Sequence, residues 1–246
     1  MEYGSKKDLL IIEETRFKGG KDAKLLIERL KKQKKDFYVR ETNFITIVVC
    51  DNIEMIYPNR GDKSFPPNQL WLFGRVKQEA ENFLRNNPKW KMPKKFPTNV
   101  TNYDYDDSFG EITGTDINGA YWQIAFNEGY ISKNTYDKAS GEEFKRTRLA
   151  ALAILGRNIA FSKYSKGVVE PKKTIFQFNQ LEVHLVYKAI RFKCFEIMQR
   201  LAKMLGEDFE AYRTDCIYYR DTPKNRAKVH KFLEKKGFSY KQLVYD

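Results

Sequence analysis

The sequence predicts an α+β protein in which a central antiparallel sheet is backed by helices and preceded by a small α/β region. Two long stretches, 142–159 and 179–205, carry apolar residues at helical spacing. Between and after them lie short apolar runs of strand length. A lysine- and proline-rich stretch interrupts the pattern near residues 88–102. We therefore expect a small α/β region over 1–102 and a second, sheet-centred domain over 103–246.

The first hundred residues alternate between strand-like and helix-like segments. A helix is predicted where Ala23, Leu26, Ile27 and Leu30 share one face and lysines the other. Asp51-Asn52 is a plausible turn between two strands. The segments in chain order are an apolar run at 9–13, a helix at 22–35, strands at 37–40, 44–50 and 54–57, and a helix at 69–85.

Residues 88–102 form the predicted linker, and their first ten residues read PKWKMPKKFP. Lysines alternate there with Trp90 and Phe96, so the segment could instead bind a single nucleic-acid strand. Aromatic rings would stack on bases while lysines meet phosphates. A plain solvated linker is the alternative.

The second domain begins near Tyr103 and contains two further long helices. A strand that ends at Asp116 is followed directly by a helix start. Two strands surround Arg213-Thr214-Asp215 as a hairpin, and Gly237 closes a basic helix. The predicted segments are a strand at 111–116, helices from 119–127, 142–159 and 179–205, strands at 209–212 and 216–219, a helix at 224–236 and a strand at 238–245.

Charge and composition narrow the classes of function. The chain has 45 lysines and arginines against 32 acidic residues, a formal charge of +13. Such an excess favours a polyanionic partner, although a lysine-rich, AT-biased genome would also produce it. No apolar stretch is long enough for a membrane span, and no signal-peptide pattern opens the chain.

Cysteine and histidine usage points to an intracellular, cytoplasmic protein without zinc. The three cysteines are scattered and lie in apolar runs, which fits a reducing compartment. The only histidines, His184 and His230, belong to no cluster with zinc spacing. Neither has an obvious partner in sequence for a nucleophilic triad.

Asp116 and Asp215 are the candidate metal ligands. Each follows a strand, and each has apolar neighbours. Two carboxylates that converge at one end of a sheet would bind a hard divalent cation through oxygen. Such ions support phosphoryl and nucleotidyl transfer. The alternative is that Asp116 caps a helix and Asp215 serves a tight turn.

Three motifs, in this order, resemble those of family B DNA polymerases. Residues 116–124 (DINGAYWQI) are similar to the first palm motif, an aspartate followed by a tyrosine that begins a helix. Residues 148–156 (RLAALAILG) keep the basic residue and the glycine of the fingers motif. Residues 213–218 (RTDCIY) keep the second aspartate of the last palm motif. The resemblance covers roughly residues 105–246.

The resemblance implies a polymerase-like palm with short helical fingers. Asp116, Asp215 and the carbonyl of Ile117 would hold two Mg²⁺ ions, or Mn²⁺ in their place. Tyr121 would lie under the sugar and disfavour a ribose 2′-hydroxyl. Arg148 would meet the triphosphate, unless it is a solvated helix charge, and two neighbours would assist it. These neighbours are Arg146 and Arg157.

The resemblance has departures. Arg213 replaces the first aspartate of the last motif, and Leu152 and Leu155 replace the asparagine and tyrosine of the fingers. We expect short fingers and no thumb, hence distributive synthesis or a partner protein that supplies the thumb or processivity.

Three functions compete. The leading one is a DNA polymerase-like nucleotidyltransferase that takes a primer–template or single DNA strand and deoxynucleoside triphosphates, as in replication by a phage within a bacterial host. The second is a catalytically decayed, palm-derived nucleic-acid-binding protein. The third is a plain interaction module, since 15% of the residues are aromatic.

Overall fold

The protein is a mixed α+β chain whose described strands form two separate sheets. It divides into two compact units, which are described one at a time below. Unit 1 comprises Met1–Pro88 and Asp137–Val186, and unit 2 comprises Lys89–Tyr136 and Tyr187–Asp246. The computed structural model describes residues 12–18, 22–42, 45–59, 65–102, 110–156, 159–176 and 183–243.

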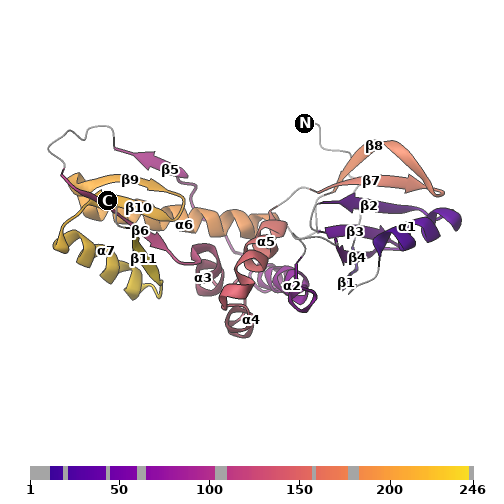
Figure 1. Ribbon diagram of the computed structural model, residues 1–246, viewed down its shortest axis with the longest axis horizontal. Coiled ribbons are helices and arrows are strands. Elements are labelled where there is room, and N and C mark those ends of the chain that lie inside the picture. Colours follow the sequence, from indigo (N-terminus) through magenta and orange to yellow (C-terminus); the bar gives the residue numbers. More distant parts are fainter. Residues whose placement is uncertain are drawn as a thin grey trace. The chain divides into compact units, whose positions relative to one another are not determined.

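Unit 1 is built on a mixed sheet, seen with α1 at the right of Figure 1. Its edge strand β1 runs parallel to β4, and every other described pairing is antiparallel. Across the sheet the strands follow the order β1 (Glu14–Phe17), β4 (Ile53–Pro58), β3 (Ile45–Cys50), β2 (Phe37–Glu41), β7 (Ile159–Ser165) and β8 (Val168–Phe176).

Helices complete the core of unit 1. Helix α1 (Ala23–Lys32) begins at Asp22, whose side chain accepts a hydrogen bond from the Lys24 amide. Its apolar stripe packs on the sheet, where Phe37 and Val48 are fully buried. The 3₁₀ turn Pro67–Gln69 leads into α2 (Trp71–Asn86), and Glu142–Phe144 leads into α5 (Lys145–Leu155). Helices α2 and α5 pack against each other.

The predicted second domain, 103–246, does not form one unit, because part of it belongs to unit 1. Strand β7 pairs with β2, and β8 pairs with β7, so residues 137–186 belong to unit 1 rather than to the C-terminal domain. The helix predicted to reach Ile159 ends at Leu155. Polar residues divide this hairpin into apolar runs of only two or three residues, at 159–161, 168–169 and 175–176, which are shorter than a typical strand.

Unit 2 contains an antiparallel sheet with the order β11 (Tyr240–Leu243), β6 (Ile112–Ile117), β10 (Cys216–Arg220), β9 (Phe209–Arg213) and β5 (Asn99–Thr101). The sheet lies at the left of Figure 1. Strand β5 falls within the predicted linker, whose other residues also join the unit. The Trp90 ring meets that of Tyr130, and the Tyr212 hydroxyl donates to the Pro97 carbonyl at 2.9 Å. The stretch is therefore not a plain linker.

Helices α6 (Val183–Leu205) and α7 (Pro223–Lys235) lie on one face of the sheet of unit 2. Tyr212, Ile217, Thr115 and Gln242 form one row across four strands. Helix α6 reaches this row through Gln199, which donates to the Tyr212 hydroxyl at 2.8 Å. Helix α7 reaches it through His230, 2.9 Å from Gln242. Because neighbouring residues of a strand point to opposite faces, Asp116 and Cys216 lie on the other face.

The remaining helices of the C-terminal half are short. Helix α3 (Ala120–Asn127) follows β6 after Gly119, which has a φ of +56°. Helix α4 (Lys133–Lys138) and the 3₁₀ turn Gly206–Asp208 follow α3 and α6. Within the described residues, no helix combines the length and apolar character needed to cross a membrane. The predicted central antiparallel sheet backed by helices is confirmed.

Candidate two-carboxylate site

Asp116 lies near the end of β6, in a row of side chains that crosses the sheet of unit 2. Strand register places it between Cys216 of β10 and Lys241 of β11. Beyond Cys216, the same row continues with Arg213 of β9 and Asn99 of β5. Lys241 makes an ion pair with Asp116, with 3.2 Å between Nζ and Oδ2. The carboxylate is thus presented on the face opposite α6 and α7.

Asp215 lies in the tight turn between β9 and β10. The Ile117 amide donates a hydrogen bond of 3.1 Å to the Asp215 carbonyl, which ties this turn to the residue after Asp116. Thr214, at the tip, donates its amide to Thr98 and accepts a weak bond from the Cys194 thiol at 3.5 Å. The structure therefore brings together the two aspartates that the sequence singled out.

The turn has an unusual backbone. Thr214 has a φ of +56°, in the left-handed region that β-branched residues rarely enter. Such conformations persist where surrounding contacts over-determine them, and they are enriched at functional sites. Here the contacts to Thr98 and Cys194 hold the tip.

The charge of Asp116 acts on the carboxyl group of Asp215. Burial raises the pKa of the Asp215 carboxyl, and the charge of Asp116 raises it further, while Lys241 opposes both effects. A carboxylate destabilised in this way gains from any added cation. Burial also raises the pKa of the Cys216 thiol to about 11 and that of Cys194 still higher, so neither is a ready thiolate.

Tyr121 is the second residue of α3 and lies near Arg191 of α6. Burial raises the pKa of its hydroxyl to about 12, and a hydrogen bond with Arg191 of α6 opposes the rise. The sequence argument missed Arg191, because a single arginine in a long amphipathic helix carries no signal of its own.

The arginines of the fingers motif lie in unit 1. Arg148 is buried, and its Nη1 donates to the carbonyls of Ala139 and Gly141 at 2.6 and 2.9 Å. It is therefore not the solvated helix charge that was the alternative interpretation. Arg146 is exposed, with its guanidinium 5.0 Å from the centre of the Phe65 ring. Arg157 lies outside the described residues.

The donor set limits the kind of metal that unit 2 could hold. Among the described residues, no group of three or more histidine, cysteine, aspartate or glutamate side chains is placed to bind a metal ion. A zinc or calcium cage is therefore not formed by them. Magnesium usually needs only one or two protein carboxylates, because water and substrate phosphates complete its shell. Asp116 and Asp215 fit that requirement.

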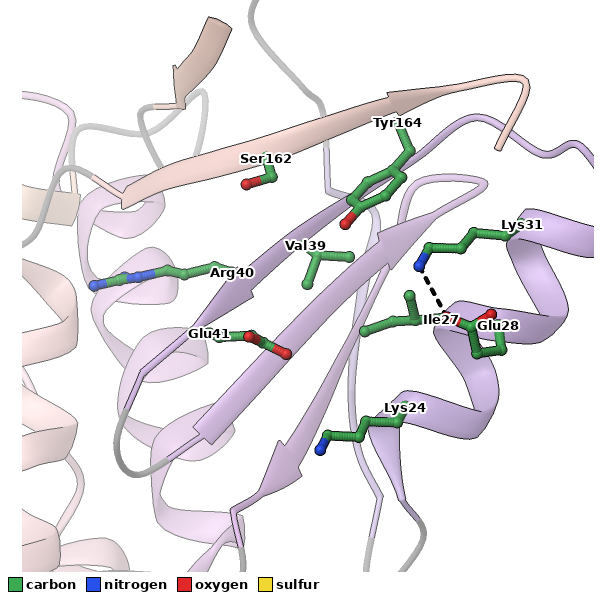
Figure 2. Close-up of a pocket in the computed structure, with 9 residues that line it drawn as sticks. All are labelled: Lys24, Ile27, Glu28, Lys31, Val39, Arg40, Glu41, Ser162 and Tyr164. Carbon is green, nitrogen blue, oxygen red and sulfur yellow. Dashed lines mark hydrogen bonds and ion pairs between the residues drawn. The ribbon is translucent and has the colours of Figure 1, made fainter. Parts of the chain in front are cut away.

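Unit 1 has two pockets of its own. The first, of about 510 Å³, lies between α1 and strands β2 and β7; Figure 2 shows Lys24 and Lys31 near Glu28 and Glu41, with the Tyr164 ring above them. Lys31 is already paired with Glu28 at 2.8 Å. The second, of about 590 Å³, is mainly apolar and lies beside α5.

Comparison with known proteins gives no relative. No protein-family profile, no curated protein sequence and no solved structure matches the chain. The site must therefore be interpreted from its own residues.

Proposed function

We propose that unit 2 is a polymerase-like palm and that the protein transfers nucleotides to the 3′-hydroxyl of a DNA strand, directed by a template. The observation that carries this proposal is the pairing of β6 with β10. It places Asp116 directly across from Cys216 and one residue from Asp215, on a sheet whose other face is covered by helices.

The chemistry of the pair suits this reaction. Two magnesium ions held between the aspartates and a triphosphate would lower the cost of the developing charge on the reacting phosphate. The protein's own contribution is positional: β6 and the hairpin turn fix the carboxylates, and the turn is braced by the Ile117 amide. The resemblance to family B polymerases would put the sugar of the incoming nucleotide on Tyr121.

The net charge of +13 supports a DNA partner and deoxynucleoside triphosphates as substrates. The second candidate is a palm-derived nucleic-acid-binding protein without catalysis. Arg213 favours it, because a basic residue replaces an acid in the row beside Asp116. Both candidates predict DNA binding, and only the first predicts metal-dependent binding of a triphosphate.

The test compares three variants of the full chain with the wild type. Asp116→Asn and Asp215→Asn each remove one carboxylate of the pair, and Glu207→Gln removes an exposed carboxylate of the same unit. Binding of Mn²⁺ is followed by electron paramagnetic resonance, and primer extension by gel. We expect each aspartate variant to lose at least about 100-fold in extension, since metal ions stabilise the transition state by several kcal/mol.

The outcomes separate the candidates. Extension by the wild type and by Glu207→Gln, but not by the aspartate variants, supports the polymerase. DNA binding without extension or Mn²⁺ binding supports the decayed palm. An equal effect of all three substitutions would sink the two-carboxylate site.

A further inference from the structure

Two basic side chains lie on either side of Asp116 in the row formed by Lys241, Asp116, Cys216 and Arg213. Lys241 is on the strand next to Asp116, and Arg213 is two strands away on the other side. Neighbouring strands are about 4.8 Å apart, so the Cα atoms of Lys241 and Arg213 are roughly 14 Å apart. Both side chains are long enough to reach a group bound at Asp116.

Lys241 is placed to exchange partners. Its side chain is 60% exposed, against 26% for Asp116, with 3.2 Å between their charged atoms. An ion pair this open to water contributes little to stability. A divalent cation that bound Asp116 would displace the ammonium group at little cost, and the lysine would then stand beside the cation.

Arg213 is exposed at the end of β9, next to the turn that carries Asp215. A guanidinium bonds two oxygens of one phosphate in a planar fork, and it stays charged at any physiological pH. In its position the resemblance predicts an acid, and a carboxylate there would repel phosphate. With Arg213 in place of that acid, the β9 end of the row is cationic and not anionic.

The fingers arginine does not offer this function. Arg148 belongs to unit 1, where it is buried and bonded to the main chain of residues 139 and 141. A triphosphate at Asp116 and Asp215 brings several negative charges, and it needs cations from the protein as well as from the metal. The exposed side chains of Lys241 and Arg213 could supply two of them.

We propose that Lys241 and Arg213 bind the phosphate groups of a nucleoside triphosphate at the Asp116–Asp215 pair, with Lys241 leaving Asp116 when a divalent cation arrives. This inference rests on the proposed function. It assigns to the palm sheet itself the phosphate contacts that a fingers domain would otherwise make.

The test separates binding of the metal from binding of the phosphates. For Lys241→Gln, Arg213→Gln and the control Lys231→Gln, we would measure the affinity for Mn²⁺ alone and then for dTTP and dTMP at saturating Mn²⁺. Lys231 is an exposed lysine of α7, the helix on the opposite face. All three variants lose one positive charge from the same unit, and a melting curve for each confirms folding.

For Lys241→Gln, we expect the affinity for Mn²⁺ to rise and the affinity for dTTP to fall. Lys241→Gln should bind Mn²⁺ alone about 2- to 5-fold more tightly, because the competing ammonium is gone. It should bind dTTP about 10-fold more weakly, with little change for dTMP. Arg213→Gln should weaken dTTP binding similarly and leave Mn²⁺ binding unchanged. Lys241→Arg should restore dTTP binding, and Lys231→Gln should resemble the wild type.

Failure of this inference is distinguishable from failure of the proposed function. If the wild type binds neither Mn²⁺ nor dTTP, both are overturned. If the wild type binds both and Asp116→Asn loses them, but the Lys241 and Arg213 variants keep wild-type affinity for dTTP, only the phosphate contacts are wrong. Lys231→Gln could also lose as much dTTP affinity as Lys241→Gln and Arg213→Gln. The losses would then come from the lower net charge alone, and the inference would be overturned.

Discussion

The guanidinium of Arg148 lies 2.6 Å from the carbonyl oxygen of Ala139, in the loop that precedes its own helix. A second bond, of 2.9 Å, reaches the carbonyl of Gly141. Both acceptors are main-chain groups, and the arginine is only 8% exposed. A buried charge of this kind fixes the loop and leaves the fold dependent on it.

Arg148→Met should therefore destabilise the protein. It removes the donor and leaves carbonyl groups unsatisfied in a buried position, at a cost of about 2–3 kcal/mol. In a chain of this size the melting temperature should fall by about 5–10 °C. Arg146→Met is the matched control, since Arg146 is on the same helix but is exposed. Its melting temperature should fall by no more than about 2–3 °C. A stable Arg148→Met that has lost triphosphate binding would instead restore the role that the family resemblance implies.

Thr214 is strained at the tip of the Asp215 turn, with its φ of +56°. Thr214→Asn should stabilise the protein by about 1 kcal/mol, because asparagine enters the left-handed region more readily than a β-branched residue. The expected rise in melting temperature is about 2–4 °C. Thr101→Asn, on the exposed edge strand β5, should lower it slightly. Equal shifts in both variants would show that the turn holds no strain.

Gly167 turns the β7–β8 hairpin over the end of α1. A Cβ at this position would lie 2.5 Å from the Lys31 carbonyl oxygen, and φ is +79°. Gly167→Ala should lower the free energy of unfolding by about 3 kcal/mol, because an alanine would be forced into the left-handed region and its Cβ would clash with the backbone. Gly129→Ala is the control, because Gly129 has a φ of +73° and nothing within 4 Å of the added carbon. It should cost only about 1–2 kcal/mol. Urea unfolding of both variants measures the difference, and a Gly167→Ala variant as stable as Gly129→Ala would contradict the close approach.

Local patterns predicted many of the individual elements. Helical spacing predicted α1, α2 and α6, and Asp51-Asn52 indeed turns between β3 and β4, with both residues at positive φ. The patterns could not predict that β7 pairs with β2, because that pairing joins residues more than a hundred positions apart. The division into two units depends on that pairing, so it was missed as well.

The candidate site shows the same limit. The two aspartates could be paired from sequence because each follows a strand-like run and precedes a turn or helix. Lys241 could not, because its place beside Asp116 depends on the register between β11 and β6. A shift of that register by one residue would turn the lysine to the face of α7. Arg148 reads as a surface charge only until the fold of its preceding loop is known.

Glu54 provides a test of buried charge in unit 1. It is 2% exposed on β4, opposite Thr15 of β1. Within the described residues, no hydrogen-bond partner reaches its Oε2. Burial raises the pKa of the Glu54 carboxyl, and Lys77 and Thr15 only partly oppose the rise. The folded protein therefore favours the protonated form more than the unfolded chain does.

The sign of the pH dependence follows. Below the ordinary pKa of a glutamate, both states are protonated and Glu54 carries no penalty. As the pH rises through the higher pKa of the folded state, the charged form must stay buried, and stability is lost. Glu54→Gln resembles the protonated form, so it should melt about 2–4 °C above the wild type at pH 7 and level with it near pH 4.

Glu28→Gln is the control for this prediction. Glu28 is exposed, and its hydrogen bond with Lys31 lowers the pKa of its carboxyl. The stability that this pair contributes is present at neutral pH and lost as the pH falls, so the variant should melt slightly lower than the wild type at pH 7. Melting curves at pH 4 and pH 7 compare the two variants. If Glu54→Gln melts below the wild type at pH 7, the attraction between Glu54 and Lys77 outweighs the cost of burying the charge.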